Sequence, residues 1–300
     1  MSQLLQTKVE LLHSQHLSCG ESPLYDYEKQ ILYWVDSAKE GVYSYNFLTS
    51  EVVFIPTPMA VTFVSLRQDG GLVLGSTAGV FVLPSAEAAP ERVFSASQAL
   101  VQLNDAIADP HGRIFTGQEA YTDETPHRTG FLFRLSPDGS VDIVEEGLSI
   151  SNGMGFSPDL TTFYLIDTIA RKLYAYDYHV ESGNISRRRV LRQFQEEEGL
   201  PDGMTVDEEG LLWVAMWFGA AVLRIDPEGK TVTKLKLPFT QPTSVCFGGR
   251  DLNQLYITSA ANLWKTSLAP PRHDYQRSRG GAVYQVRLKI RGRKEYMAKF

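Results

Sequence analysis

The sequence contains few cysteines and lacks any long hydrophobic run. Its 300 residues include two cysteines, Cys19 and Cys246, too few for the disulfide framework of a small secreted domain. We expect both to be small buried side chains rather than a disulfide. No stretch approaches the length of a membrane-spanning helix. The first residues lack the basic segment and apolar core of a signal peptide, so the expected location is a reducing cytoplasm.

The sequence also has no excess of positive charge. It carries 29 Lys and Arg against 35 Asp and Glu, which gives a net charge of -6. This balance argues against a nucleic-acid or membrane partner, because both would require a basic face. Hydrophobic residues make up 43% and charged residues 21%, as in ordinary globular proteins. We expect one domain covering residues 1–300.

Sustained helical periodicity is absent, and short β-rich runs repeat at a spacing of roughly 40–50 residues. Six copies of one unit can be aligned. The first strands are predicted at 24–26, 61–67, 106–108, 154–156, 204–206 and 244–247. Second strands are predicted at 31–36, 72–76, 114–117, 162–167, 211–216 and 254–259, and third strands at 41–47, 79–83, 130–135, 172–178, 221–226 and 281–287. Outer strands are plausible at 51–55, 91–94, 141–145, 188–193 and 231–236.

Turn residues separate these runs, as in Ser136-Pro137-Asp138-Gly139. Proline presets the turn, Asp or Ser caps it, and glycine takes the positive φ. Six such units predict an all-β protein, a six-bladed β-propeller with four-stranded blades. The last unit lacks an outer strand, and residues 9–13 could supply it and close the ring. Closure could also bring Cys19 and Cys246 close together. The long polar loop 262–280 is either a lid or a surface excursion.

Four oxygen-bearing side chains share one phase, just before the first strand of their unit: Glu21, Asn104, Asn152 and Asp202. In a propeller this position lies at the mouth of the central channel, where the four side chains would converge. Carboxylate and amide oxygens suit a hard divalent cation such as Ca²⁺, Mg²⁺ or Mn²⁺. Zinc usually recruits His or Cys, although oxygen-rich sites can take it. The plainer alternative is that these are turn residues, which Asn and Asp favour.

Other signals are weak. The six histidines show no zinc-protease spacing, and no G-x-S-x-G motif is present. Four aromatic residues in predicted strands are expected to pack between blades: Tyr33, Trp34, Trp213 and Trp217. Trp217 ends the second strand of the fifth unit and is expected to lie away from the mouth.

The chain resembles the SMP-30/gluconolactonase/LRE family, which includes sugar lactonases, over essentially its whole length. The resemblance rests on five pieces together: Cys19-Gly20-Glu21-Ser22-Pro23, Leu103-Asn104-Asp105 with Asp109-Pro110-His111-Gly112-Arg113, Ser151-Asn152-Gly153, Pro201-Asp202-Gly203-Met204 and Cys246-Phe247-Gly248-Gly249. It implies a six-bladed propeller with one divalent metal ion (Ca, Mg, Mn or Zn) and hydrolysis of a small-molecule aldonolactone to the sugar acid.

The resemblance also implies roles for individual residues. Glu21, Asn152 and Asp202 match the metal ligands, and Asn104 matches a residue that helps to bind substrate or water. Asp202 could act both as ligand and as the general base toward water. Two positions depart from the pattern: Gln102 stands where many relatives have Arg, and Glu119 stands in Gly117-Gln118-Glu119-Ala120 where many read Gly-Thr-Met-Ala. Both are candidate substrate contacts.

Two alternatives to a sugar lactonase remain open. The same metal site could hydrolyse another ester, such as an aryl lactone or a phosphotriester, because Gln102 and Glu119 alter the pocket. A propeller could also serve as a metal-binding scaffold without turnover. The intact ligand set disfavours that role, since a pure scaffold has no need for Glu21, Asn152 and Asp202 in phase.

Overall fold

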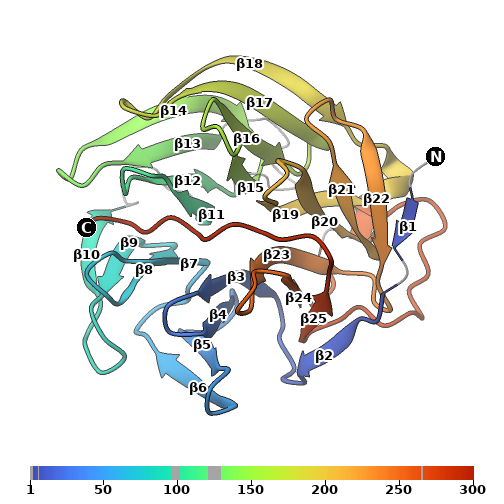
Figure 1. Cartoon of the computed structure of the whole chain (residues 1–300), viewed down its shortest axis with the longest axis horizontal. Helices are drawn as coiled ribbons and strands as arrows, with labels where there is room; N and C mark the ends of the chain where they lie inside the picture. Colours follow the sequence, from blue (N-terminus) through green and yellow to red (C-terminus); the bar gives the residue numbers. More distant parts are fainter. Residues whose placement is uncertain (1–2, 6, 96–101, 121–129, 265) are drawn as a thin grey trace.

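The computed structural model describes residues 3–5, 7–95, 102–120, 130–264 and 266–300. Strands dominate these residues and form six sheets arranged radially around one axis (Figure 1). The predicted all-β fold, a six-bladed β-propeller, is confirmed. Two short 3-10 turns, η2 (Glu196–Glu198) and η3 (Thr266–Leu268), interrupt the strands. Within the described ranges, no helix is long and apolar enough to cross a membrane.

Each blade is an antiparallel sheet whose first strand lies nearest the axis, where it contacts the first strands of its neighbours. The first three blades comprise β3 (Gly20–Asp26), β4 (Ile31–Asp36), β5 (Gly41–Asn46) and β6 (Glu51–Pro56); β7 (Phe63–Leu66), β8 (Leu72–Ser76), β9 (Gly79–Leu83) and β10 (Glu91–Ser95); and β11 (Leu103–Ala108), β12 (Ile114–Gln118), β13 (Gly130–Leu135) and β14 (Val141–Leu148). The four-stranded repeat predicted from the turn spacing is therefore present in each of them.

The remaining blades follow the same order from the axis outward. They comprise β15 (Ser151–Phe156), β16 (Thr162–Asp167), β17 (Lys172–His179) and β18 (Asn184–Gln193); β19 (Leu200–Val206), β20 (Leu212–Trp217), β21 (Ala221–Ile225) and β22 (Thr231–Lys236); and β23 (Pro242–Gly248), β24 (Gln254–Ser259) and β25 (Val283–Arg287). The sixth blade thus takes only three strands from this part of the chain.

The N-terminal residues complete the ring. Strand β2 (Glu10–His13) pairs antiparallel with β25 and supplies the fourth strand of blade six, as predicted from the missing strand there. Strand β1 (Gln3–Leu5) pairs parallel with β22 and adds a fifth strand to blade five, which the repeat did not predict. In Figure 1 the N-terminal strands therefore lie beside the last two blades. This pairing covers sheet edges that would otherwise be open.

Hydrophobic clusters lie between every pair of neighbouring blades, including the first and the sixth. Trp34 and Trp213 are fully buried, and Tyr33 is buried with them in the inter-blade core, which confirms the prediction for these three aromatics. Burying such rings between sheets contributes much of the stability of a radial fold, because each blade alone leaves both faces exposed.

In five blades the first strand begins earlier than predicted, whereas in blade two β7 begins at Phe63, two residues later than predicted. In five blades the pairing between first and second strands shifts register near the start of the first strand. Blade two keeps a regular register. Such bulges re-aim a side chain without ending the strand. Glu21, Asn152 and Asp202 lie at or beside these shifts, so the candidate ligands sit inside strands rather than in turns.

The axis is crowded where these strands meet. A Cβ added at Gly153 would lie 2.6 Å from the Met204 nitrogen, and one at Gly203 would lie 2.1 Å from Ser244 Oγ. Only glycine permits this approach. The glycines that follow Asn152 and Asp202 therefore let neighbouring first strands bring their polar residues together.

After β25, residues 288–300 form a C-terminal segment that crosses the ring (Figure 1). Its backbone bonds to several blades in turn: Glu208 N–H donates to the Arg291 carbonyl, Ala298 N–H to Leu66, and Lys299 N–H to Gly112. Nothing in the repeat pattern predicted this segment. It holds blades together across the axis and closes the end of the channel where the first strands finish.

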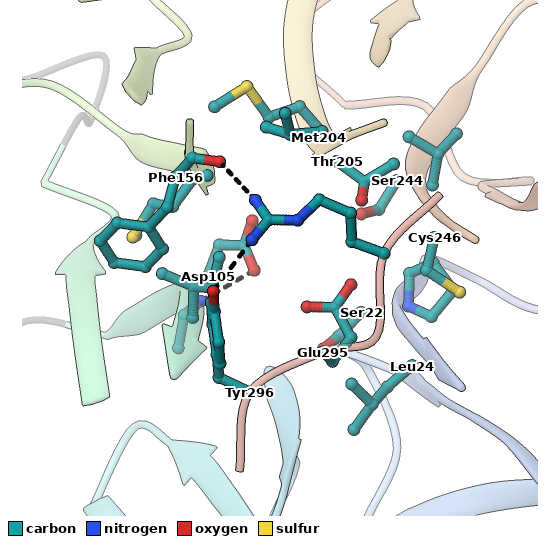
Figure 2. A pocket seen from close by; sticks show the side chains of 18 of the residues that line it. Ser22, Leu24, Asp105, Phe156, Met204, Thr205, Ser244, Cys246, Glu295 and Tyr296 are labelled. Carbon is teal, nitrogen blue, oxygen red and sulfur yellow. Dashed lines mark hydrogen bonds between the residues drawn. The ribbon is translucent and has the colours of Figure 1, made fainter. Parts of the chain in front are cut away.

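A cavity of about 80 Å³ lies between the C-terminal segment and those strand ends. The Arg293 guanidinium enters it and donates hydrogen bonds to the Phe156 carbonyl at 3.3 Å and to the Tyr296 hydroxyl at 2.9 Å (Figure 2). Glu295 and Asp105 also line this cavity. Burial raises the pKa of Glu295 to about 7, against an opposing effect of Arg293 and with a further increase from Asp105. The Glu295 charge in turn raises the pKa of Cys246 beyond the increase due to burial.

Glu295→Gln is expected to stabilise the protein at pH 8 but not at pH 5. An acid whose folded-state pKa lies above its unfolded value makes the fold less stable as the pH rises from about 4.5 to about 7. Over this pH range, the free energy of unfolding of the wild-type protein should therefore fall by on the order of 1–3 kcal/mol relative to that of the variant. Urea unfolding at pH 5 and pH 8 measures the difference. Glu28→Gln is the matched control, because Glu28 is exposed and pairs with Lys294 at 2.9 Å; an equal pH dependence in both variants would contradict the assignment.

Candidate metal centre and active site

A second cavity, of about 140 Å³, lies at the opposite end of the axis, where the first strands begin. We call it the mouth cavity. All six residues singled out from the sequence line it: Glu21, Gln102, Asn104, Glu119, Asn152 and Asp202. They come from blades one, three, four and five. The structure thus brings together the four in-phase residues and the two that depart from the family pattern.

Buried aspartates position the strands that carry these residues. Asp36, at the end of β4, accepts hydrogen bonds from the backbone N–H groups of Ser18 and Cys19, both at 3.0 Å. Asp167, at the end of β16, accepts from the N–H of Ser149 at 3.3 Å and of Ile150 at 3.4 Å. In both blades the aspartate fixes the chain just before the candidate ligand. Sequence reasoning missed this role, although both residues end the second strand of their unit.

The amide side chains are held through their nitrogen atoms. Asn104 Nδ2 donates to the Ser151 carbonyl at 3.0 Å, and Asn152 Nδ2 donates to Thr168 Oγ1 at 3.2 Å. Each contact leaves the amide oxygen available to another partner. Asn152 is 7% exposed and Asp202 5% exposed. Asn152 therefore presents a buried amide oxygen whose orientation is fixed, beside the buried carboxylate of Asp202 on the neighbouring blade.

The carboxyl groups of the cavity destabilise one another's charged forms. Burial, followed by the Asp202 and Asp105 charges, raises the pKa of Glu21 well above its usual value. Burial and the Asp105 charge do the same for the pKa of Asp202, and burial raises that of Asp105 to about 6. Glu119 adds a smaller increase at both Glu21 and Asp202. Four acidic groups at one site need a positive partner to remain ionised together.

The chemistry of this donor set fits a hard divalent cation. No Lys, Arg or His is among the described residues that line the mouth cavity, so the protein itself offers no positive partner there. Carboxylate and amide oxygens are the ligands that such cations prefer. Across the described ranges, no three His, Cys, Asp or Glu side chains are placed as a ready metal cluster. A site of Glu21, Asn152 and Asp202 has only two carboxylates, and its third donor is an amide.

Asp105 was not predicted from the sequence as a site residue. It lines both axial cavities, and its charge raises the pKa of both Glu21 and Asp202. Its backbone follows Asn104, and its Oδ1 accepts a hydrogen bond from the Ala106 N–H at 2.8 Å. A signal was present, because Asp105 belongs to the same Leu103-Asn104-Asp105 motif.

The expectation that Trp217 lies away from the mouth is wrong. Trp217 pairs with Leu200, the first residue of β19, and it lines the mouth cavity. The reason is geometric: β20 runs antiparallel to β19, so its last residue returns to the end where the first strand began. Trp217 occupies the position that Asp36 holds in blade one and Asp167 in blade four.

Part of the loop 262–280 forms one wall of the mouth cavity, through Asn262 and Trp264. Trp264 packs edge-to-face on Trp217 with ring centroids 5.9 Å apart, and Leu268 packs in the same cluster. Gln241 Nε2 donates to the carbonyl of Asn262 at 2.8 Å and fixes the start of the loop. The loop is thus a constituent of the site, although residue 265 lies outside the described residues.

Cys19 and Cys246 are both free and line different cavities. Cys19 belongs to the mouth cavity, and Cys246 belongs to the cavity under the C-terminal segment. The expectation of two unbridged thiols is confirmed, but only Cys246 is buried and Cys19 is half-buried. The structure does not support the suggestion that ring closure places the two thiols together. Cys19 lies just before the start of β3, and Cys246 lies toward the end of the neighbouring strand β23.

Comparison with known proteins identifies the family. Residues 19–261 match the model of the SMP-30/Gluconolactonase/LRE-like region. The chain is 35% identical to regucalcin from Bos taurus over 84% of this chain and 87% of that one, and 34% identical to a pentonolactonase from Haloferax volcanii over 92% and 93%. The structure superposes on a luciferin-regenerating enzyme with a TM-score of 0.90, 31% identity, and coverage of 98% and 100%. The chain therefore belongs to the SMP-30/gluconolactonase/LRE-like family.

Proposed function

We propose that this protein is a metal-dependent lactonase that hydrolyses a small aldonolactone to the open sugar acid. The observation that carries the proposal is the mouth cavity, in which Glu21, Asn152 and Asp202 converge with no basic side chain among its described lining residues. The 34% sequence identity of this chain to a pentonolactonase, over most of both chains, adds support. A non-catalytic scaffold would leave such a crowded set of acids without a purpose.

In this proposal Glu21, Asn152 and Asp202 hold one divalent cation through two carboxylates and the Asn152 amide oxygen. When bound, the cation supplies Lewis acidity, which polarises an ester carbonyl and makes a nearby water more acidic. The donor set favours Ca²⁺, Mg²⁺ or Mn²⁺ over Zn²⁺, because no thiolate or imidazole is present among the three. Three protein ligands leave room for water and substrate.

The protein's own residues would carry out the proton transfer and the positioning. Asp202 accepts a proton from the attacking water while the water oxygen bonds to the carbonyl carbon of the lactone. The bond between the carbonyl carbon and the ring oxygen then breaks, and the ring oxygen takes the proton from Asp202 and leaves as a hydroxyl group, which returns Asp202 to its carboxylate form. The product is a carboxylic acid, which ionises and releases one proton per turnover at neutral pH.

The remaining mouth residues would orient the substrate. Asn104 is tethered to Ser151 through Nδ2, so its oxygen can accept a hydrogen bond from water or from a sugar hydroxyl. Gln102 and Glu119 line the same cavity and offer further polar contacts. Because Gln102 is neutral and no basic side chain is among the described residues that line the cavity, the pocket contributes no fixed positive charge and is suited to a neutral lactone. We also propose a cytoplasmic location, which the two free thiols support.

Removal of the metal is expected to abolish hydrolysis. Proton release from glucono-, galactono- and xylonolactone should be followed for chelated protein and for protein reloaded with Ca²⁺, Mg²⁺, Mn²⁺ or Zn²⁺. Chelated protein should match the spontaneous rate, and at least one metal should restore acceleration. Full activity after chelation would contradict the metal site. No acceleration with any metal would contradict the sugar lactonase, and an aryl lactone and a phosphotriester in the same panel would then test other esters.

A further inference from the structure

The mouth cavity has an aromatic wall in addition to its acidic one. Trp217 and Trp264 line it together with Leu200. The two indoles are 5.9 Å apart at 73°, and Phe218 packs edge-to-face on Trp217 at 6.0 Å. Trp217 is 4% exposed, whereas Trp264 is only partly buried. A rigid ring in the second strand of blade five thus holds the more accessible ring of the loop against the cavity.

Three polar atoms on residues of this cavity have no hydrogen-bond partner. They are Thr62 Oγ1, Trp217 Nε1 and Asn262 Oδ1, each buried and unpaired among the described residues. Buried polar atoms in folded proteins are almost always paired, so three orphans at one cavity call for an explanation. A bound ligand or water is the usual one.

The chemistry of these atoms is complementary to that of hydroxyl groups. The indole N–H can only donate, the amide oxygen can only accept, and the threonine hydroxyl can do both. A hydroxyl group on a ligand can satisfy each of them. A purely apolar ligand would fill the space beside the tryptophans but would leave all three atoms unpaired.

A hydroxylated ring fits both features at once. The C–H faces of such a ring are apolar and can pack against the flat indole of Trp264, while its edge carries hydroxyl groups that reach polar atoms nearby. Binding sites for small molecules commonly combine aromatic walls with a few convergent polar groups. The acidic wall would meanwhile face the reacting carbonyl.

We propose that Thr62, Trp217, Asn262 and Trp264 form a subsite that binds the hydroxylated ring of the substrate. This inference rests on the proposed lactonase function and identifies the residues that select its substrate. It predicts that the protein discriminates lactones by their hydroxyl groups. A site built to pair with hydroxyl groups strongly rejects an analogue that lacks them, because its own polar atoms then stay unpaired.

Paired substrates test the subsite. D-glucono-1,5-lactone and δ-valerolactone share a six-membered lactone ring, but only the first carries hydroxyl groups. The wild-type protein should prefer gluconolactone by at least about a hundredfold in kcat/KM. Thr62→Val removes one hydroxyl while keeping the shape, and Trp217→Phe removes the indole N–H while keeping a smaller aromatic ring. Each should lower kcat/KM for gluconolactone by roughly 3–10-fold more than it lowers kcat/KM for δ-valerolactone.

Trp264→Leu tests the stacking face, and Leu263→Ala is its matched control. Leu263 is the neighbouring residue in the same loop, but it is exposed and does not line the cavity. Trp264→Leu should raise KM for gluconolactone by on the order of tenfold, and Leu263→Ala should not. Equal losses for both substrates in the Thr62 and Trp217 variants, or no loss at all, would overturn the subsite.

A binding measurement separates this inference from the lactonase proposal. D-glucono-1,5-lactam is a neutral analogue that resists hydrolysis, and its binding should change the tryptophan fluorescence, because two of the four tryptophans line the cavity. Thr62→Val should weaken lactam binding by the same factor as it lowers kcat/KM. Lactam binding without hydrolysis of any lactone would sustain the subsite and reject the lactonase. Lactam affinity that is unchanged in all three variants would reject the subsite even if the protein is a lactonase.

Discussion

Asp202→Asn is expected to lower kcat/KM for the best lactone by on the order of a thousandfold or more. Asp202 lies in the bulged start of β19 and lines the mouth cavity with Glu21 and Asn152. Asparagine keeps the shape but cannot accept a proton from water, and it donates no negative charge to a cation. The protein should still fold, because the change removes one of four acidic groups that crowd a buried cavity.

The experiment needs both a binding and a rate measurement. Calorimetry should show weaker metal binding for Asp202→Asn, while thermal unfolding without metal should be unchanged or shifted upward. Asp226→Asn is the matched control in the same blade: Asp226 only caps a surface turn, where it accepts hydrogen bonds from the Glu228 and Lys230 N–H groups. Hydrolysis by Asp202→Asn at more than about a tenth of the wild-type rate would exclude Asp202 as general base.

Glu119→Gln distinguishes binding of the metal from binding of the substrate. If Glu119 contacts only the substrate, its variant should change KM while metal affinity stays near that of the wild-type protein. This outcome would differ from that of Asp202→Asn, in which both quantities change.

The propeller was predictable because its determinants are local and repeated. Turns such as Ser136-Pro137-Asp138-Gly139 encode hairpins by themselves, and six repetitions leave a ring as the natural arrangement. The phase of Glu21, Asn152 and Asp202 was equally readable. All three lie near the start of the first strand of their units, and the radial arrangement of the blades brings these strand starts together around one cavity.

Features that break the repeat were not predictable in the same way. The C-terminal segment and the placement of Trp264 depend on contacts between residues far apart in the sequence, for which the repeat has no counterpart. The strand bulges depend on how closely Gly153 and Gly203 let the strands approach. Trp217 is different, because the antiparallel rule applied to β19 and β20 would have placed it at the mouth from the sequence alone.

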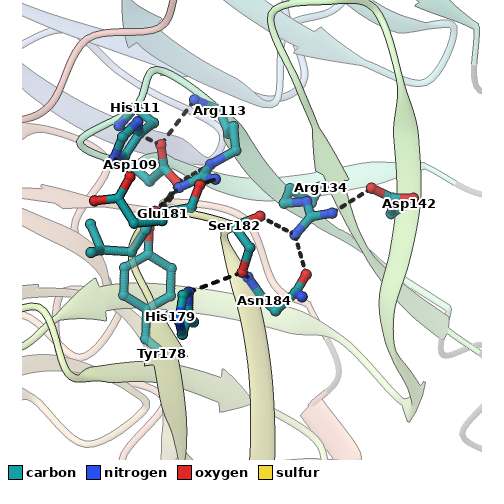
Figure 3. A network of polar contacts seen from close by, with 11 residues as sticks. Asp109, His111, Arg113, Arg134, Asp142, Tyr178, His179, Glu181, Ser182 and Asn184 are labelled. Atoms are coloured by element: carbon teal, nitrogen blue, oxygen red, sulfur yellow. Dashed lines mark hydrogen bonds and ion pairs between the residues drawn. The ribbon is translucent and has the colours of Figure 1, made fainter.

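One motif used to recognise the family has a structural role remote from the mouth cavity. Asp109 is fully buried in the turn between β11 and β12. It accepts hydrogen bonds from Arg113 Nε at 2.5 Å and from the Tyr178 hydroxyl at 2.8 Å. The Arg113 guanidinium also donates to the carbonyls of Val180 and Glu181. Figure 3 shows this network joining blade three to blade four.

Arg113→Leu is therefore expected to destabilise the protein by about 3–5 kcal/mol, because it leaves the Asp109 carboxylate buried without its cation. The melting temperature should fall by roughly 5–10 °C, while kcat/KM at low temperature stays near the wild-type value. Arg134→Leu is the control at the same blade junction (Figure 3), since its partner Asp142 is 50% exposed and can be solvated. This control substitution should lower the free energy of unfolding by about 1 kcal/mol or less. Arg113→Leu combined with Asp109→Asn should recover part of the loss, because no buried charge is then unpaired. A double variant less stable than Arg113→Leu alone would show that the packing of the arginine, rather than its charge, joins the two blades.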